Sequence, residues 1–142
     1  MSKDLENILV VSIEQAVAAP YLSSRLADAG ARVIKVERHE GDFARKYDDF
    51  VNGDSAYFVW LNRGKESIAL NLKDKKDLQV LKNIIKKSDI LIQNLAPGAF
   101  ERLGLNLKEL RDKHPKLITC SCLLYTSPSP RDRNVSRMPS SA

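Results

Sequence analysis

Three side chains suited to binding an anionic or carbonyl ligand come just after predicted strands. Gln15 follows the run at residues 8–13, Arg38 follows residues 31–37, and Asn94 follows residues 90–92. A guanidinium can grip phosphate through two hydrogen bonds, and a side-chain amide can donate to a ligand oxygen. Ligands of open α/β sheets bind at the carboxyl ends of the strands, where these residues would lie. The alternatives are that Arg38 is an ordinary surface residue and that Asn94 caps a turn.

The first predicted βα turn, residues 12–20, has the sequence SIEQAVAAP and contains no glycine. The chain contains neither G-x-G-x-x-G nor G-x-x-x-x-G-K-[ST]. Without these glycines the backbone cannot approach a pyrophosphate closely, so NAD or ATP binding of the usual kind is disfavoured. Arg38 nevertheless stands where dinucleotide folds read the ribose, and an arginine there suits a phosphorylated ribose.

The elements that would position these residues alternate between strand and helix. Apolar, β-branched runs predict strands at residues 8–13, 31–37, 67–72, 90–92 and from 117 onward. Helical spacing predicts helices within residues 15–30, 74–87, 99–103 and 107–113. Asp74 is the expected N-cap of one helix, and Gly30 is the expected C-terminal stop of another. Residues 39–62 are predicted to be a long irregular connection.

This alternation predicts an α/β fold with a Rossmann-like, mostly parallel sheet and helices on both faces, truncated after its fifth strand begins. A chain of 142 residues with 43% apolar residues can build one core. The longest apolar runs are too short to span a bilayer, and residues 1–7 lack an apolar signal segment. We therefore expect a cytoplasmic protein that does not enter membranes.

The formal charge of +5 is not concentrated in one basic stripe. Residues 122–142 carry three arginines and one aspartate, so the rest of the chain carries +3. There the lysines alternate with acids, as in KDKKD at residues 73–77. This pattern is typical of a solvated helix face, and no nucleic-acid partner is expected.

The chemistry-bearing residues do not assemble a catalytic or metal motif. Cys120 and Cys122 form C-x-C without a second ligand pair, so no metal is predicted. His39 and His114 have no serine or cysteine partner that would suggest a triad. Glu37 ends a strand, and Asp42 is expected in a solvated turn, so neither is predicted to be a nucleophile. The same holds for a third carboxylate, Asp28, which lies on a predicted helix.

The composition changes abruptly after Ser121. Residues 122–132, CLLYTSPSPRD, match one reading frame of a common transposon-type sequencing adaptor, and residues 136–142 fit its distal end. We predict that residues 1–121 are part of a natural Rossmann-like domain and that residues 122–142 are a non-native tail. A disordered Ser/Pro tail is the alternative. Sequencing the parent gene through the Ser121 codon tests the prediction of a non-native tail, because a gene that encodes residues 122–142 as written would contradict it.

Four motifs then occur in register: LADAGARVIKVER, GDFAR, LNRGKESIALNLK and QNLAPGAFERLG, at residues 26–38, 41–45, 61–73 and 93–104. Together they resemble family III CoA-transferases, a group that includes formyl-CoA:oxalate and carnitine CoA-transferases and α-methylacyl-CoA racemases. SIEQAVAAPY at residues 12–21 and YFVWLNRGKES at residues 57–67 resemble members that handle mesaconyl, citramalyl or itaconyl groups. The resemblance covers nearly all of residues 8–121.

The resemblance implies that residues 1–121 are an N-terminal, CoA-binding Rossmann-like domain, present in part, and that CoA is the ligand. Arg38 would bind its 3′-phosphorylated adenosine end, and Lys73 and Arg102 would meet phosphates. Leu70 and Leu95 would contact the adenine or the pantetheine, although the family often has phenylalanine where Leu95 stands. The alternative for the cations is a solvated surface, and for the leucines a plain core position.

Two amide side chains complete the implied site. Asn94 would hydrogen-bond the ligand. Gln15 resembles a glutamine near the thioester, where its amide could donate to the carbonyl oxyanion during acyl transfer. The spacing from Gln15 to Pro20 is two residues longer than in formyl-type members.

The family resemblance also implies covalent carboxylate catalysis. An aspartate attacks the acyl-CoA thioester to form an anhydride, CoA thiolate returns to give an enzyme-bound thioester, and the acceptor carboxylate completes the exchange. That aspartate would lie roughly fifty residues beyond Ser121, so no catalytic residue is expected in this chain and the fragment should be inactive. The full-length parent would be an interlocked homodimer acting on acyl-CoA and carboxylic acids. The alternatives are an acyl-CoA racemase and a non-catalytic CoA-binding Rossmann-like module.

Overall fold

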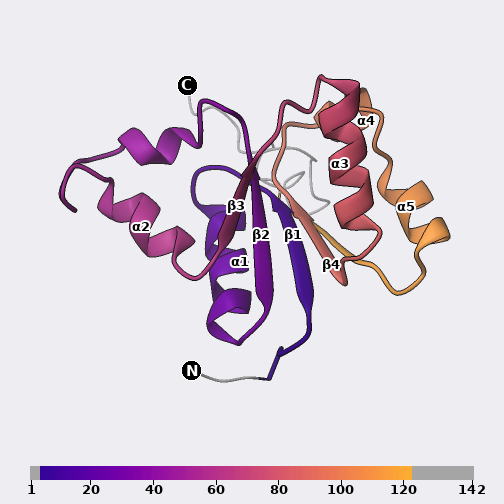
Figure 1. The fold of residues 1–142 in the computed structure, drawn as a ribbon, viewed down its shortest axis with the longest axis horizontal. Helices are drawn as coiled ribbons and strands as arrows, with labels where there is room; N and C mark the ends of the chain where they lie inside the picture. Colours follow the sequence, from indigo (N-terminus) through magenta and orange to yellow (C-terminus); the bar gives the residue numbers. More distant parts are fainter. Residues whose placement is uncertain (1–3, 123–142) are drawn as a thin grey trace, which may run out of the picture.

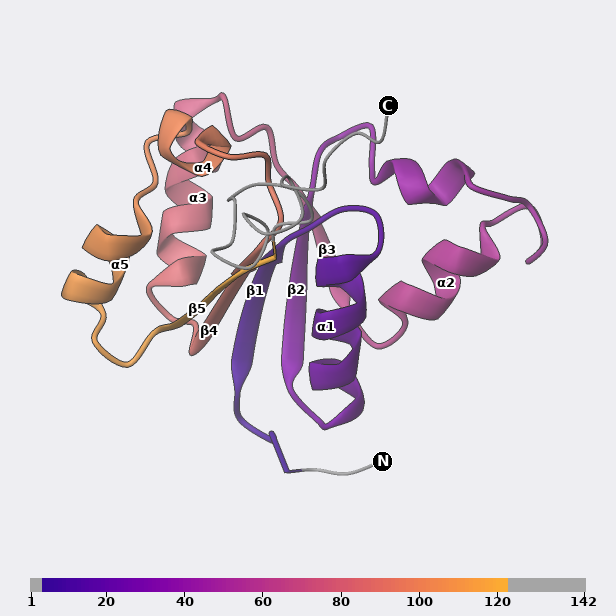
Figure 2. The same cartoon turned by 180° about the vertical axis from the view of Figure 1, so that it is seen from behind.

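The computed structural model describes residues 4–122, which form one five-stranded parallel sheet with helices on both sides (Figures 1 and 2). The strands are β1 (Leu9–Ile13), β2 (Arg32–Glu37), β3 (Glu66–Ala69), β4 (Ile90–Gln93) and β5 (Ile118–Ser121). The helices are α1 (Ala18–Asp28), the 3₁₀ helix η1 (Phe43–Lys46), α2 (Ala56–Asn62), α3 (Lys75–Ile85), α4 (Ala99–Arg102) and α5 (Leu107–Lys113). The predicted α/β fold is confirmed. The predicted non-native tail lies, from residue 123 on, outside the described residues.

The strand order is β3-β2-β1-β4-β5, so the chain starts in the middle of the sheet and builds outward in both directions. Val10 of β1 is paired with Val33 on one side and with Ile90 on the other. The direction of winding reverses between β1 and β4. In sheets of this order, ligands bind at the carboxyl ends of the strands beside such a reversal.

Each face of the sheet has its own apolar core, because successive side chains of a strand point to opposite faces. Val10, Val33 and Ile92 pack with α1, whereas Val11 and Val36 belong to the cluster that α3 covers. Figure 1 shows α1 and α3 on opposite sides of the sheet. Burying one such aliphatic side chain contributes roughly 1.5–3 kcal/mol, so these layers account for the stability of the strand frame.

The face toward α1 becomes polar at the carboxyl ends of the strands. Along β2, Val33, Lys35 and Glu37 share this face by alternation, and Ser12 of β1 is paired in register with Lys35. Ser12 and Lys35 are 0% and 1% exposed. A lysine in the centre of a parallel sheet must be compensated by buried acceptors, and these are described below.

Local signals that the sequence carries clearly are confirmed. The Asp74 side chain accepts hydrogen bonds from the backbone N–H groups of Lys76 and Asp77, which caps α3. Gly30 has φ 100° directly after α1, a conformation that glycine adopts without strain. Helix α5 spans the predicted residues 107–113.

The prediction of an irregular connection over residues 39–62 is wrong in part, because this segment contains η1 and α2. The Ser55 side chain accepts from the Phe58 N–H and so caps α2. Of the residues of α2, AYFVWLN, Leu61 alone is fully buried, and Tyr57, Val59 and Trp60 stay exposed. A run that is apolar nearly throughout has no helical stripe, so the hydrophobic period does not reveal this helix. Within residues 4–122 no helix combines the length and the apolar character needed to cross a membrane.

Candidate functional site

A cleft of about 510 Å³ opens at the carboxyl ends of the strands. It is bounded by the segments that follow β1, β2, β3 and β4, which are residues 13–15, 36–42, 70–73 and Leu95, together with Leu103 after α4. This is the edge at which the strand order places a ligand. The volume lies within the 300–1,000 Å³ typical of small-molecule and cofactor sites.

The cleft has an apolar part and a charged rim, whose exposed side chains are the cations Arg38 and Lys73 and the anion Glu40. Val36, Leu70 and Leu95 contribute apolar surface that continues into the core beneath α3. Arg38 and Lys73 line the same cleft with exposed side chains. An apolar slot beside exposed cations suits a ligand with an aromatic ring and phosphate groups.

The structure brings five of the seven predicted binding residues to this cleft: Gln15, Arg38, Leu70, Lys73 and Leu95. Asn94 and Arg102 are not among the residues that line it. The Arg102 Nη1 atom lies 3.4 Å from the Pro97 carbonyl oxygen, and the Arg102 side chain is exposed. Arg102 therefore reaches the cleft only by a change of side-chain conformation.

Asn94 clamps two strand ends together. Its Oδ1 accepts from the Gln15 N–H at 3.0 Å, and its Nδ2 donates to the Gln15 carbonyl oxygen at 2.7 Å. The clamp joins the segments after β1 and β4, on either side of the reversal in strand order. Both functional groups of the amide are thus used in fixing the backbone of a cleft residue.

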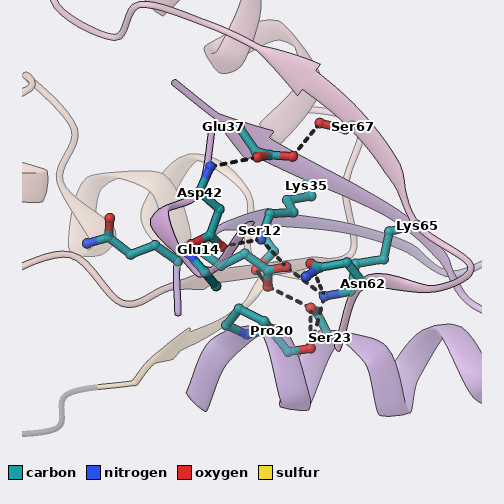
Figure 3. A network of polar contacts seen from close by, with 12 residues as sticks. Ser12, Glu14, Pro20, Ser23, Lys35, Glu37, Asp42, Asn62, Lys65 and Ser67 are labelled. Atoms are coloured by element: carbon teal, nitrogen blue, oxygen red, sulfur yellow. Dashed lines mark hydrogen bonds and ion pairs between the residues drawn. The ribbon is translucent and has the colours of Figure 1, made fainter. Parts of the chain in front are cut away.

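Four buried charged side chains form a network beneath one wall of the cleft (Figure 3). Glu14 accepts from Lys65 Nζ at 2.7 Å and lies 3.6 Å from Lys35 Nζ. Lys35 Nζ donates to Asp42 Oδ2 at 2.8 Å. All four side chains are at most 2% exposed. Two acids and two lysines balance in charge, and the network ties β1, β2 and the segments around residues 42 and 65 together. We call Glu14, Lys35, Asp42 and Lys65 the buried charge network.

Hydroxyl and carbonyl groups complete the bonding of this network. The Ser12 and Ser23 hydroxyls donate to Glu14 Oε2 at 2.5 and 2.6 Å. Lys65 Nζ also donates to the Pro20 carbonyl oxygen at 2.9 Å. Burial lowers the pKa of Lys65 below its ordinary value, while the charge of Glu14 acts in the opposite direction. Within residues 4–122 every buried side-chain nitrogen or oxygen atom has a hydrogen-bond partner.

The expectation that Asp42 lies in a solvated turn is wrong. The Asp42 side chain is fully buried, and its Oδ1 accepts from the N–H groups of Ala16 and Ala44 at 3.1 and 3.0 Å. Glycine at position 41 made a solvated turn plausible, but the buried cation of Lys35 draws the carboxylate inward.

Glu37 holds the loop that carries Arg38. Its carboxylate accepts from the Arg45 guanidinium at 3.0 and 3.3 Å, from the Ser67 hydroxyl at 2.8 Å and from the Asp42 N–H at 3.0 Å. Burial acts to raise the pKa of Glu37, but hydrogen bonds from Arg45 and Ser67 outweigh it and lower the pKa. The Arg45 guanidinium also lies 3.8 Å from the centroid of the Phe58 ring, which connects this loop to α2.

Sequence reasoning missed Glu14, Lys35 and Lys65 as structural residues. A signal for Lys35 is present, because a lysine within the strand sequence RVIKVE requires a buried acid in a two-sided sheet. Glu14 directly follows the buried β1, which is paired with the strand that carries Lys35. No feature of the sequence around Lys65 indicates that its side chain pairs with Glu14.

The described residues contain no group of three or more His, Cys, Asp or Glu side chains placed to hold a metal ion. The Cys120 and Cys122 sulfur atoms lie 3.8 Å apart. Burial raises the pKa of the Cys122 thiol to about 11, so this thiol stays protonated and weakly nucleophilic at neutral pH.

Comparison with known proteins identifies the family. The model of CoA-transferase family III matches residues 5–137, so the chain belongs to this family. The match continues past residue 122, and the boundary predicted there stays a prediction.

Two curated relatives and one solved structure illustrate the similarity. The chain is 41% identical over 117 residues to an acetyl-CoA:oxalate CoA-transferase of Acetobacter aceti, covering 82% of the chain and 30% of the relative. It is 35% identical over 130 residues to a mouse succinyl-CoA:glutarate CoA-transferase, covering 90% and 30% respectively. A hypothetical protein of Mycobacterium tuberculosis has a TM-score of 0.81 and 32% identity, with 92% of this chain and 36% of that chain covered. The chain thus spans about 30% of the length of the curated relatives it matches.

The depressed pKa of Glu37 predicts a pH-dependent contribution to stability. Because the folded-state pKa lies below the ordinary 4.5, ionised Glu37 stabilises the fold above that value, and the stabilisation is lost as pH falls through the folded pKa. We expect Glu37→Gln to lower the free energy of unfolding by about 1–3 kcal/mol at neutral pH. Urea unfolding from neutral pH down to acid should show this difference narrowing below the ordinary pKa.

Glu40→Gln makes the same chemical change at an exposed position three residues later and should follow the wild type throughout. A Glu37→Gln deficit that stays constant across the acid range would contradict the ionic role of Glu37.

Proposed function

We propose that the cleft binds coenzyme A and that the parent protein moves CoA between acyl-CoA thioesters and small carboxylic acids. The observation that carries this proposal is the joining of an apolar slot, formed by Leu70 and Leu95, to the cationic rim of Arg38 and Lys73. CoA presents an adenine ring and a 3′-phosphate close together, and the two parts of the cleft match them. Family membership independently supports CoA as the ligand.

The cleft also offers a reason why CoA binds without a glycine-rich turn. The N–H groups of Gln15 and Ala16 are occupied by the side chains of Asn94 and Asp42. Phosphates must then be held by side chains, and Arg38 and Lys73, which follow β2 and β3, line the same cleft as Gln15. In this arrangement Gln15 serves the thioester end, where its side-chain amide donates to the reacting carbonyl oxygen.

For the acids exchanged, we propose dicarboxylates of four or five carbons, such as mesaconyl, citramalyl or itaconyl groups. The sequence of residues 12–21 and 57–67 supports this choice. Oxalate and glutarate, named for the two relatives above, are also dicarboxylates. Assaying the full-length parent with mesaconate, glutarate and oxalate as acceptors tests the proposal, and equal rates with a monocarboxylate such as acetate would refute it.

We propose further that the parent is a homodimer whose second copy covers an exposed aromatic surface. This surface consists of Tyr21, Phe43, Tyr47, Tyr57 and Trp60, each 45–48% exposed. Neighbouring rings are 5.7–6.0 Å apart from centroid to centroid, so they form one continuous patch. Aromatic residues gathered in this way are typical of protein interfaces. Light scattering on the full-length parent should give the molar mass of a dimer. The mass of a monomer would contradict the proposal and would mean that the rest of the parent chain covers the aromatic surface.

Arg38 provides the sharpest test of the ligand. We expect Arg38→Gln to weaken CoA binding to the 142-residue chain about ten- to a hundredfold, because a charge-assisted hydrogen bond to phosphate is lost. Dephospho-CoA lacks only the 3′-phosphate, so the same substitution should change its affinity little. Isothermal titration calorimetry with both ligands and both proteins gives the four affinities needed.

Arg111→Gln is the matched control, since Arg111 is exposed and lies outside the cleft-lining residues. It should bind both ligands as the wild type does. If Arg38→Gln weakens the binding of CoA and of dephospho-CoA equally, Arg38 does not contact the 3′-phosphate. If the wild type binds neither compound, the proposed ligand is refuted.

A further inference from the structure

The turn between β1 and α1 has an unusual conformation for its sequence. Ala16 has φ 63°, in the left-handed region that favours glycine, although it carries a Cβ atom. A residue stays in this conformation only when its surroundings hold it there. Side chains from two distant segments do so, since Asn94 binds both backbone groups of Gln15 and Asp42 binds the N–H of Ala16.

Asp42 is itself held in one orientation. Its Oδ2 accepts from Lys35 Nζ at 2.8 Å, its Oδ1 accepts from the Ala16 and Ala44 N–H groups, and its own N–H donates to Glu37. The charge of Lys35 is shared with Glu14, which Lys65 balances in turn. The Asp42 carboxylate is therefore held both by the buried charge network, through Lys35, and by its own loop, through the N–H of Ala44.

This carboxylate takes a backbone donor that would otherwise be available to a ligand. In dinucleotide-binding turns, N–H groups at the start of the first helix face a phosphate. Here α1 begins two residues after Ala16, and the anion that accepts from the Ala16 N–H is a carboxylate of the protein itself. A negative charge near the amino end of a helix is favourable, so Asp42 stabilises the turn as well as occupying it.

We propose that Asp42 is a positioning residue that fixes the β1–α1 turn, closes it to phosphate and holds Gln15 toward the thioester end of bound CoA. The last element rests on the proposed function, whereas the first two do not. Loss of Asp42 should then weaken contacts with the pantetheine arm and leave those with the adenosine end intact.

The experiment compares wild type, Asp42→Ala and Asp42→Asn in the 142-residue chain. Amide hydrogen exchange at Ala16 reports the turn, and calorimetry with CoA and with adenosine 3′,5′-bisphosphate reports the two ends of the ligand. For Asp42→Ala we expect Ala16 protection and CoA affinity each to fall about tenfold, as for one lost hydrogen bond, while bisphosphate affinity stays within about twofold. Asp42→Asn keeps an acceptor for Ala16, so its losses should be smaller.

Asp48→Ala is the control for general damage to the loop. Asp48 also accepts backbone N–H groups, from Phe50 and Ala56, but it does not line the cleft. It should leave Ala16 protection and both affinities unchanged. If Asp42→Ala fails to fold, the smaller losses of Ala16 protection and CoA affinity expected for Asp42→Asn test the proposal instead.

Three outcomes would overturn the proposal. If a folded Asp42 variant keeps the wild-type exchange protection at Ala16, Asp42 does not fix the turn. If the variant loses equal affinity for CoA and for the bisphosphate, the role of Asp42 is merely structural. Equal losses in Asp48→Ala would do the same. If the wild type binds neither ligand, the proposed function fails, and Ala16 exchange alone then decides whether Asp42 fixes the turn.

Discussion

The buried pairing of Lys35 with Asp42 and Glu14 is the constraint on which the carboxyl edge of the sheet depends. A lysine in the middle of β2 cannot stay charged inside the protein without acids beside it, and removing one partner of such a pair typically costs about 3–5 kcal/mol. Lys65 balances the second acid from the segment before β3. Charge balance thus contributes to the course of the three connecting segments that carry Glu14, Asp42 and Lys65.

From this constraint the two walls of the cleft follow. On the α1 side of the sheet, Asp42 of the network holds the β1–α1 turn beside Gln15, while Glu37 holds the loop after β2 that carries Arg38. On the α3 side, apolar packing of Leu70 and Leu95 supplies the rest of the lining. One wall is therefore rigid through charge and the other through hydrophobic contact. The cations at the rim stay exposed, which suits a ligand that brings its own phosphates.

Much of the fold follows from local patterns in the sequence. The β-branched runs, the cap at Asp74 and the glycine after α1 give strands and helices close to those observed, because each rests on neighbouring residues. Helix α2 escapes such reasoning, since its apolar residues face outward as well as inward. The burial of Asp42 escapes it too, because its partner Lys35 lies in the preceding strand and leaves no trace in the loop sequence. The strand-end rule still gathers five of the seven predicted binding residues at one cleft.

The most direct test of the account is an NMR titration of the isotope-labelled 142-residue chain with CoA. The account predicts that the largest amide shifts fall at Arg38, Leu70, Lys73 and Leu95, around the cleft, while the Ala16 amide keeps its bond to Asp42 and shifts little. Shifts centred on Ala16 would contradict the closed turn. Shifts centred on the exposed aromatic surface would contradict the placement of the ligand in the cleft.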